Sequence, residues 1–121
     1  MKRILVVEDD ESQRMLYRDE LVDTGYDVVL AASGKEALNC LIDSKIDLVI
    51  LDIVMPEMNG LETLGTIIRL YRDIPIILHS AYPTYKDNFM SCGAEAFIVK
   101  SSNLSELKFK IREVLTTLDE V

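Results

Sequence analysis

The sequence of 121 residues lacks long hydrophobic runs, an excess of basic residues and any cysteine motif. The first apolar run, Ile4 to Val7, is too short for a signal peptide or a membrane span. A formal net charge of −8 argues against a nucleic-acid surface, which would need a basic patch. We therefore expect a protein with no membrane contact and no direct nucleic-acid contact.

Cysteines and linkers are also scarce. Cys40 and Cys92 form no metal motif, and two thiols in an acidic domain fit a reducing compartment, so we expect a cytoplasmic protein. No segment is rich enough in proline, glycine or serine to be a linker, and the sequence shows no internal repeat. We expect a single domain over residues 1–121, with no output domain in this chain.

Short apolar runs alternate with helical patterns along the chain. Ile4–Val7 and Leu48–Leu51 are continuously apolar, which is typical of strands buried on both faces. The expected strands are 4–7, 26–30, 48–51, 74–78 and 96–99, and the expected helices are 12–23, 35–43 (with Ala37, Leu38, Leu41 and Ile42 inward), 60–71, 84–92 and one that Asn103 caps. This alternation predicts an α/β, flavodoxin-like doubly wound (βα)5 fold, with a parallel five-stranded sheet in the order 2-1-3-4-5 and helices on both faces.

Polar side chains stand where four of these strands end. They are Glu8 and Asp9, Asp52, Ser80, and Lys100. Parallel strands bring their carboxyl ends to one edge of the sheet, where ligands bind in open α/β folds. One aspartate at a strand end is a common turn feature, but four such positions on one edge predict a site.

The residue types at this edge indicate its chemistry. Glu8, Asp9 and Asp52 repel one another unless a cation joins them, and a few oxygen ligands mixed with water favour Mg²⁺ over Ca²⁺. Lys100 adds a positive charge and Ser80 a hydroxyl donor, and together they suit a phosphoryl group. A carboxylate can also be the nucleophile and form an aspartyl phosphate.

The single histidine, His79, has two interpretations. It could act as a catalytic base or phosphate relay, or it could be a packed and hydrogen-bonded side chain. It lies on a strand of otherwise apolar residues and alternates away from Ser80. We therefore interpret His79 as a packed residue.

Four motifs, in this order and spacing, carry a resemblance to a known family. They are Ile4-Leu5-Val6-Val7-Glu8-Asp9-Asp10, Leu51-Asp52-Ile53-Val54-Met55-Pro56 with Gly60, Ser80-Ala81, and Gly93-Ala94 leading to Phe97 and Val99-Lys100. Over essentially its whole length the chain resembles a response regulator receiver domain.

The resemblance implies a role for each matching residue. Asp52 corresponds to the phosphoacceptor, and Lys100 to the family's lysine. Mg²⁺ would be held by the carboxylates of Asp9 and Asp52, by Glu8 through water, and by the backbone carbonyl of Val54, while Ser80 and Phe97 match the switch positions.

The resemblance also implies partners. The phosphoryl group would come from a histidine of a sensor kinase or from a phosphotransfer protein. A downstream protein or effector domain would read the change at the fourth helix, fifth strand and fifth helix, a surface through which a homodimer could also form. The domain would be a signalling phosphoacceptor rather than an enzyme, although it would assist its own phosphotransfer and dephosphorylation.

Two positions depart from the family pattern. Glu8 stands where aspartate is commonest, and its longer side chain still reaches a metal through water. Ser101 stands where proline usually follows the lysine, so the sequence leaves the isomer of the Lys100–Ser101 peptide bond open.

Three other classes of protein fit the sequence less well. A phosphohydrolase would want a second acid at position 54, which is valine. A flavodoxin would want a phosphate loop rich in serine, threonine and glycine after the first strand, where this chain is acidic. A degenerate receiver-like interaction domain would be expected to lose Asp52 or Lys100, and both are present.

Overall fold

The computed structural model describes residues 1–52, 60–83, 86–90, 93–101 and 103–119. The strands are β1 (Arg3–Val7), β2 (Asp27–Ala31), β3 (Leu48–Leu51), β4 (Ile76–Ser80) and β5 (Ala96–Val99). The helices are α1 (Glu11–Thr24), α2 (Gly34–Asp43), α3 (Gly60–Leu70), α4 (Lys86–Met90) and α5 (Ser105–Asp119). Within the described ranges, no helix is long and apolar enough to cross a membrane.

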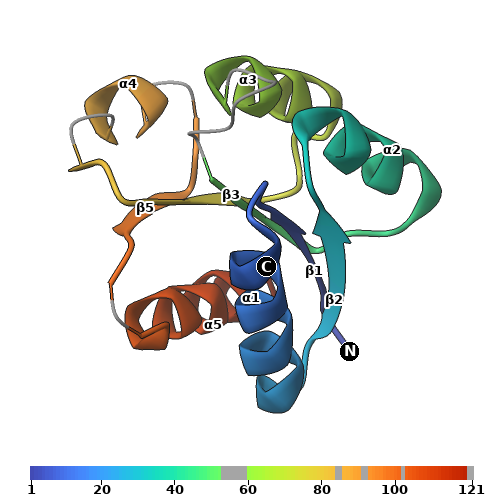
Figure 1. Cartoon of the computed structure of the whole chain (residues 1–121). Helices are drawn as coiled ribbons and strands as arrows, with labels where there is room; N and C mark the ends of the chain where they lie inside the picture. The colour runs from blue at the N-terminus through green and yellow to red at the C-terminus, as the bar shows by residue number, and fades with distance from the viewer. Residues whose placement is uncertain (53–59, 84–85, 91–92, 102, 120–121) are drawn as a thin grey trace.

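The strands form one 5-stranded sheet in the order β2-β1-β3-β4-β5, and each pair of neighbours is parallel. A helix follows each strand along the chain, as Figure 1 shows. The predicted strand order and the flavodoxin-like class are therefore confirmed. β2 lies at one edge of the sheet, while β1 and β3 lie side by side within it.

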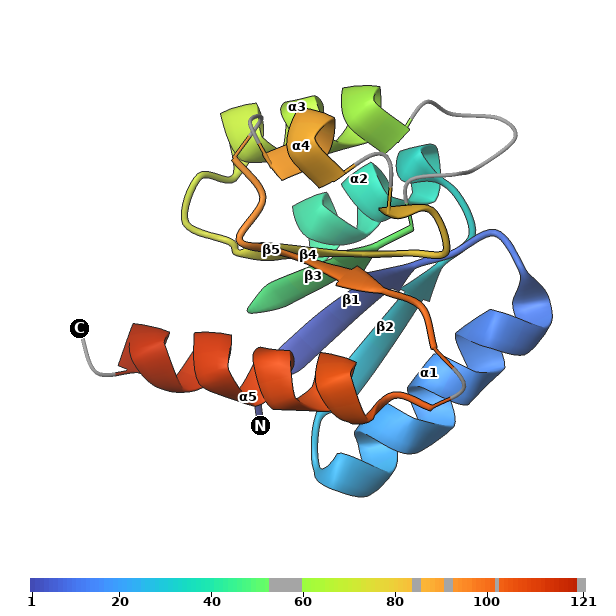
Figure 2. The same cartoon turned by 90° about the vertical axis from the view of Figure 1, so that its left-hand side faces the viewer.

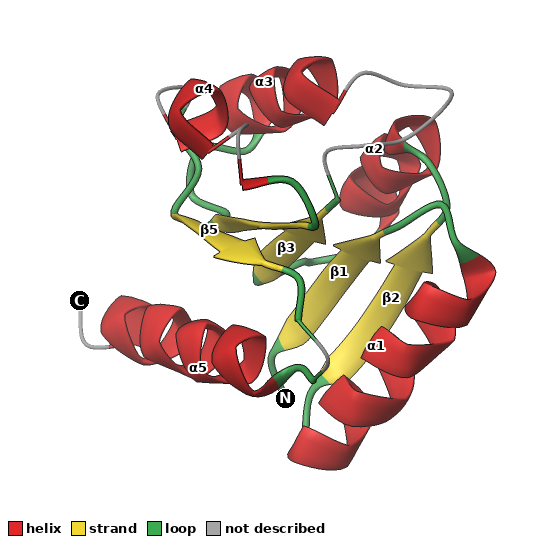
Figure 3. Cartoon of the chain, turned by 60° about the vertical axis from the view of Figure 1, so that its left-hand side comes forward, coloured by secondary structure: helices red, strands yellow, loops and turns green. Residues whose placement is uncertain are grey.

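Helices cover both faces of the sheet (Figures 2 and 3). On one face, α1 and α5 pack on Ile4, Val6 and Ile50 through Tyr17, Leu21, Leu107 and Ile111. On the other face, α2 and α3 pack on Leu5, Val7 and Val49 through Ala37, Leu41, Leu64 and Ile67. Successive residues of one strand thus enter opposite cores, which explains why β1 and β3 are apolar at nearly every position.

Two sequence predictions need correction. β4 begins at Ile76 rather than at Ile74, because Pro75 has no N–H for the ladder and pairs only through its carbonyl, which accepts from Val49 N at 3.0 Å. Ile42 does not face the core but is 72% exposed. A helix turns about 100° per residue, so Ile42 points away from the buried side of Leu41.

Capping residues fix where α1 begins and ends, and its first turn lies beside the carboxyl ends of the strands. Asp10 caps the helix, and its side chain accepts from the backbone N–H of Gln13 at 2.9 Å. The helix ends at Gly25 as predicted, with a φ of 111° and an N–H that donates to the carbonyls of Leu21 and Val22. α1 therefore starts at a fixed point directly after the Glu8-Asp9 pair.

Candidate functional site

The carboxyl ends of neighbouring strands bring the predicted site residues together. The backbone N–H of Asp52 donates to the carbonyl of Val7 at 3.1 Å, which keeps the chain after β3 paired with β1. The backbone N–H of Lys100 donates to the carbonyl of Ser80 at 2.7 Å, which does the same for β5 and β4. The backbone of the sheet thus fixes where the Asp52 and Lys100 side chains start.

Lys100 connects the site. Its ammonium donates to Glu8 Oε1 at 2.7 Å, to Gln13 Oε1 at 2.6 Å and to Asp52 Oδ2 at 3.2 Å. An ammonium has three hydrogens, so these acceptors use all of them. The Lys100 side chain is 18% exposed, and those of Glu8 and Asp52 are 2% and 11% exposed, so solvent screens the two ion pairs weakly.

The acidic side chains form a compact cluster. One ligand oxygen from each of Glu8, Asp9 and Asp52 can lie within 4.8 Å of the others. Burial raises the pKa of Glu8 to about 7; the hydrogen bond from Lys100 opposes this, and the charge of Asp52 adds to it. The charge of Asp52 is thus a smaller cause of the rise than burial, and a divalent cation between the two carboxylates would offset that part of it.

The pKa of Lys100 changes in the same sense. Burial acts to lower it, but the hydrogen bond to Glu8 and the charge of Asp52 outweigh burial, so the pKa is raised. Glu8 and Lys100 therefore both favour their proton-bound forms. The site as a whole attracts positive charge, and carboxylate oxygens are the ligands that Mg²⁺ prefers. The residues present thus fit the predicted metal.

A cavity of about 310 Å³ opens above this cluster. Its walls include Asp9, Asp10, Ala81 and Tyr82, together with the three residues joined by ion pairs. Asp9 is exposed, whereas Glu8 is buried. The cavity therefore gives a small anion or a metal direct access to Asp9, Asp52 and Lys100.

The predicted site residues that remain are Ser80, Phe97 and Val54. Ser80 is fully buried, and its hydroxyl accepts from the backbone N–H of Tyr82 at 3.0 Å. Phe97 is half-buried on β5 and packs on the core beneath α2 and α3. Val54, the predicted carbonyl ligand, lies outside the described residues. No cis peptide bond occurs among the described residues, which include Lys100 and Ser101.

His79 is the packed residue that the sequence predicts. It is 3% exposed, its Nδ1 is hydrogen-bonded to the Tyr17 hydroxyl, and the two rings meet edge to face with centroids 5.6 Å apart. Burial, and then the nearby charge of Lys100, lower the pKa of His79 to about 4. At neutral pH the imidazole is therefore uncharged and ties α1 to β4.

Two side chains of α1 were missed by the sequence argument. Gln13 accepts from Lys100, and the guanidinium of Arg14 donates to the carbonyls of Glu8 and Asp9 at 2.8 and 2.9 Å. One signal was available for Gln13, because it precedes the inward residue Tyr17 by four positions and so shares its helix face. Nothing in the sequence pointed to Arg14.

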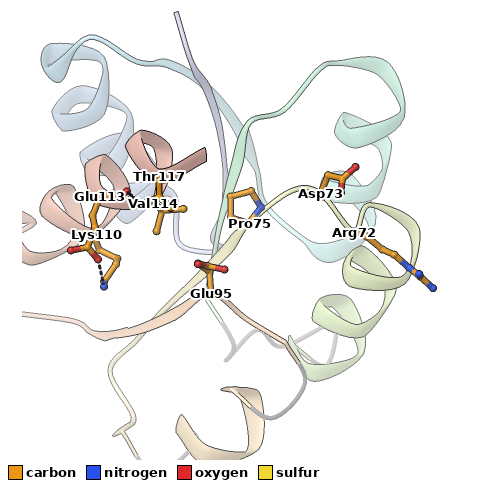
Figure 4. A pocket seen from close by; sticks show the side chains of 8 residues that line it. All are labelled: Arg72, Asp73, Pro75, Glu95, Lys110, Glu113, Val114 and Thr117. Carbon is orange, nitrogen blue, oxygen red and sulfur yellow. Dashed lines mark hydrogen bonds and ion pairs between the residues drawn. The ribbon is translucent and has the colours of Figure 1, made fainter. Parts of the chain in front are cut away.

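A larger cavity, of about 390 Å³, lies at the opposite ends of the strands from the acidic cluster (Figure 4). Pro75 and Glu95, which line it, precede β4 and β5, so it faces the amino ends of these strands. Lys110 and Glu113 on its α5 side form an ion pair at 2.7 Å. This cavity is remote from the acidic cluster, and the chemistry derived above does not involve it.

Comparison with known proteins identifies the relatives of this chain. The family model of the response regulator receiver domain matches residues 4–112. A probable transcriptional regulator, ycf27, from Porphyridium aerugineum is 36% identical over 98% of this chain and 50% of its own length. The transcriptional regulatory protein CpxR from Escherichia coli is 35% identical over 95% of this chain and 50% of its own. The chain thus spans about half the length of these curated relatives.

Solved structures show the same likeness. The response regulator protein TrrA from Thermotoga maritima, in complex with Mg²⁺-BeF, is 44% identical with a TM-score of 0.88, over 93% of this chain and 98% of that one. A complex of TrrA with the histidine kinase ThkA also matches, at 44% identity and a TM-score of 0.87, over 95% of this chain and 99% of the matched chain. A CheY-like receiver domain protein from Methanospirillum hungatei is 30% identical with a TM-score of 0.92, over 99% of this chain and 98% of that one.

Proposed function

Because the chain belongs to the response regulator receiver domain family, we propose that it is a phosphorylation-dependent signalling domain in which Asp52 accepts the phosphoryl group. One observation carries the proposal: Lys100 lies within hydrogen-bond distance of Asp52, beside a cluster of carboxylates at the carboxyl edge of the sheet. The proposed donor is a phosphohistidine of a sensor kinase or of a phosphotransfer protein. The complex of TrrA with a histidine kinase supports a kinase partner.

The proposed transfer step involves one bond formed and one broken. A carboxylate oxygen of Asp52 attacks phosphorus, and the bond from phosphorus to the donor nitrogen breaks. The imidazole of the donor carries a proton on its other ring nitrogen, so it keeps the electron pair of that bond and leaves as a neutral imidazole. Lys100, already 3.2 Å from Asp52 Oδ2, donates to a phosphoryl oxygen and balances its negative charge.

We propose that Asp9 and Asp52 hold Mg²⁺ through their carboxylates, with Glu8 acting through water and the Val54 carbonyl completing the protein ligands. Bound there, the ion would neutralise negative charge on the transferring phosphoryl group. The compact carboxylate cluster supports this assignment, and so does the Mg²⁺-BeF complex of TrrA.

We place the output surface on α4, β5 and α5. Ser80 and Phe97 are the proposed switch residues, because one stands at the site end of β4 and the other contacts the core beside α4. Val99 of β5 and Phe109 of α5 are 40% and 68% exposed, and exposed apolar side chains suit contact with a downstream partner or a second copy. Residues 1–121 form one receiver domain in this proposal, a signalling domain rather than an enzyme.

Incubation with acetyl phosphate and Mg²⁺ tests the proposal without a kinase. We expect one phosphoryl group per chain, measured by intact mass, and none when EDTA removes the metal. The donor is small and carries its own phosphoryl group, so the result depends only on this chain. Equal labelling with and without metal, or no labelling at all, would contradict the proposed function.

Substitution of the two adjacent acids separates their roles. Asp9 is exposed to the cavity, whereas Glu8 is buried and already bonded to Lys100. We therefore expect Asp9→Asn to weaken Mg²⁺ binding by at least about 10-fold, and Glu8→Gln to weaken it less. A Mg²⁺ titration followed by amide NMR shifts measures both. The opposite ranking would show that the direct ligand is Glu8.

We also expect the phosphorylated state to be long-lived. Tyr82 lines the cavity and is 52% exposed, so its ring can cover a phosphoryl group on Asp52 and limit the approach of water. Tyr82→Ala should accelerate phosphate release severalfold after the donor is removed, while Tyr82→Phe, which keeps the ring, should not. Equal release rates for both variants and the parent would exclude the ring as a lid.

A further inference from the structure

Among the described residues, Gln13 is the one hydrogen-bond partner of the Lys100 ammonium that has no role in the proposed chemistry. Of the three acceptors around the ammonium, Glu8 and Asp52 are carboxylates of the metal cluster. Gln13 is a neutral amide on α1 and makes the shortest of the three contacts, at 2.6 Å. Metal binding and phosphorylation change the charge around both carboxylates, but neither reaction alters the Gln13 amide.

The position of Gln13 is fixed from several sides. Its backbone N–H donates to the capping side chain of Asp10 at 2.9 Å. The next residue, Arg14, donates to the carbonyls of Glu8 and Asp9 and so ties the first turn of α1 to the acidic pair. One turn later, Tyr17 is hydrogen-bonded to the buried His79 of β4. The Gln13 side chain therefore extends from a helical turn that is held at both ends.

Gln13 also separates two cavities. It lines the acidic cavity of about 310 Å³ and, with Lys100, a neighbouring cavity of about 260 Å³ whose walls include Leu16, Tyr17 and Leu104. On the α1 side of Lys100, the other α1 residues that line the neighbouring cavity are Leu16 and Tyr17, and the Tyr17 hydroxyl is already bonded to His79. Without Gln13, the Lys100 ammonium would keep, among the described residues, the two carboxylates as hydrogen-bond partners. The ammonium would lose its position when these carboxylates bind a metal or when Asp52 becomes an acyl phosphate.

We propose that Gln13 is a positioning residue: its amide oxygen anchors the Lys100 ammonium above Asp52, so that the lysine is already placed for the phosphoryl oxygen during transfer. The inference rests on the proposed function of Asp52 and extends it to a residue of α1. Gln13 itself touches neither the phosphoryl group nor the metal in this account. It acts through Lys100, whose contribution to the transfer depends on geometry.

The test compares Gln13→Met, which has a similar shape and no strong acceptor, with Gln13→Glu, which keeps an acceptor oxygen at the same reach. With acetyl phosphate at saturating Mg²⁺, we expect Gln13→Met to lower the labelling rate by about 2- to 12-fold, the effect of one net hydrogen bond. Mg²⁺ affinity should not change in Gln13→Met. Gln13→Glu should label faster than Gln13→Met, and Ser12→Ala, at an exposed neighbouring position, should match the parent.

A second readout needs no phosphorylation. The hydrogens of the Lys100 ammonium, followed through its ¹⁵N signal, should exchange slowly with solvent in the parent. They should exchange faster in Gln13→Met and slowly again in Gln13→Glu. Parent-like labelling or an unchanged ammonium signal in Gln13→Met overturns the positioning role, while labelling of the parent still upholds the proposed function. A loss of Mg²⁺ affinity equal to the loss of rate would also overturn it, since Gln13 would then act through the metal.

Discussion

Asp52→Asn is expected to take up no phosphoryl group from acetyl phosphate in the presence of Mg²⁺, whereas the parent takes up one. An amide has nearly the shape of a carboxylate, but its oxygen is a poor nucleophile. The side chain can still accept from Lys100, which lies 3.2 Å from Asp52 Oδ2, so the fold should survive the change. Intact mass measures the uptake, and thermal unfolding confirms that the variant is folded.

A matched control uses another aspartate of the same chain. Asp19 lies exposed on α1, where its carboxylate pairs with Arg18 at 3.3 Å, outside the acidic cavity. Asp19→Asn should therefore be labelled like the parent. Full labelling of Asp52→Asn would mean that a different side chain accepts the phosphoryl group.

The second large effect concerns stability in the absence of metal. The pKa of Glu8 is raised from 4.5 to about 7 in the folded protein, so between these pH values the folded state binds more protons than the unfolded state. The free energy of unfolding then falls as pH rises through this window. The shift corresponds to about 3 kcal/mol. Glu8→Gln has no such carboxyl group and should not lose this stability.

His79 changes the unfolding free energy with pH in the opposite direction, so its contribution must be separated from that of Glu8. Its pKa is lowered from 6.5 to about 4, so its contribution to stability grows as pH rises from about 4 to 6.5. The two effects overlap in the parent protein and partly cancel. The informative quantity is therefore the difference in unfolding free energy between Glu8→Gln and the parent. Both proteins contain His79, so its contribution cancels in this difference.

We expect this difference to grow in favour of Glu8→Gln by about 3 kcal/mol between pH 4.5 and pH 8 in EDTA. Denaturant unfolding at several pH values measures it, with Glu106→Gln, exposed on α5, as a control that should show no such trend. Saturating Mg²⁺ at pH 8 should reduce the difference, because Mg²⁺ binding stabilises the folded parent more than the folded Glu8→Gln variant. A difference that does not vary with pH would contradict a pKa of Glu8 that burial raises in the folded protein.

Much of the fold could be predicted because the sheet is buried on both faces. After Arg3, every residue of β1 and β3 is apolar, since alternate side chains enter the two cores. The same pattern makes a polar residue at a strand end conspicuous, and Asp52 and Lys100 were found in this way. Ile42 was misplaced because an apolar residue at the border of a helix face can turn outward without breaking the pattern.

The contacts that complete the site could not be derived from the sequence. Gln13 meets Lys100 across 87 positions and Tyr17 meets His79 across 62. Both contacts depend on how α1 is rotated on the sheet, which the helical pattern fixes only to within a face. The hydroxyl of Ser80 was predicted at the right edge, but its bond to the N–H of Tyr82 depends on the local path of the loop.

Chemical trapping of the phosphorylated side chain tests the central claim most directly. Borohydride reduces an aspartyl phosphate to homoserine, which marks the position permanently for peptide mass spectrometry. After labelling with acetyl phosphate and Mg²⁺, the account predicts homoserine at position 52 alone, and none when EDTA replaces the metal. Homoserine at position 9 or at another aspartate, or a phosphoryl group that resists borohydride, would contradict the assignment of Asp52 as the phosphoacceptor.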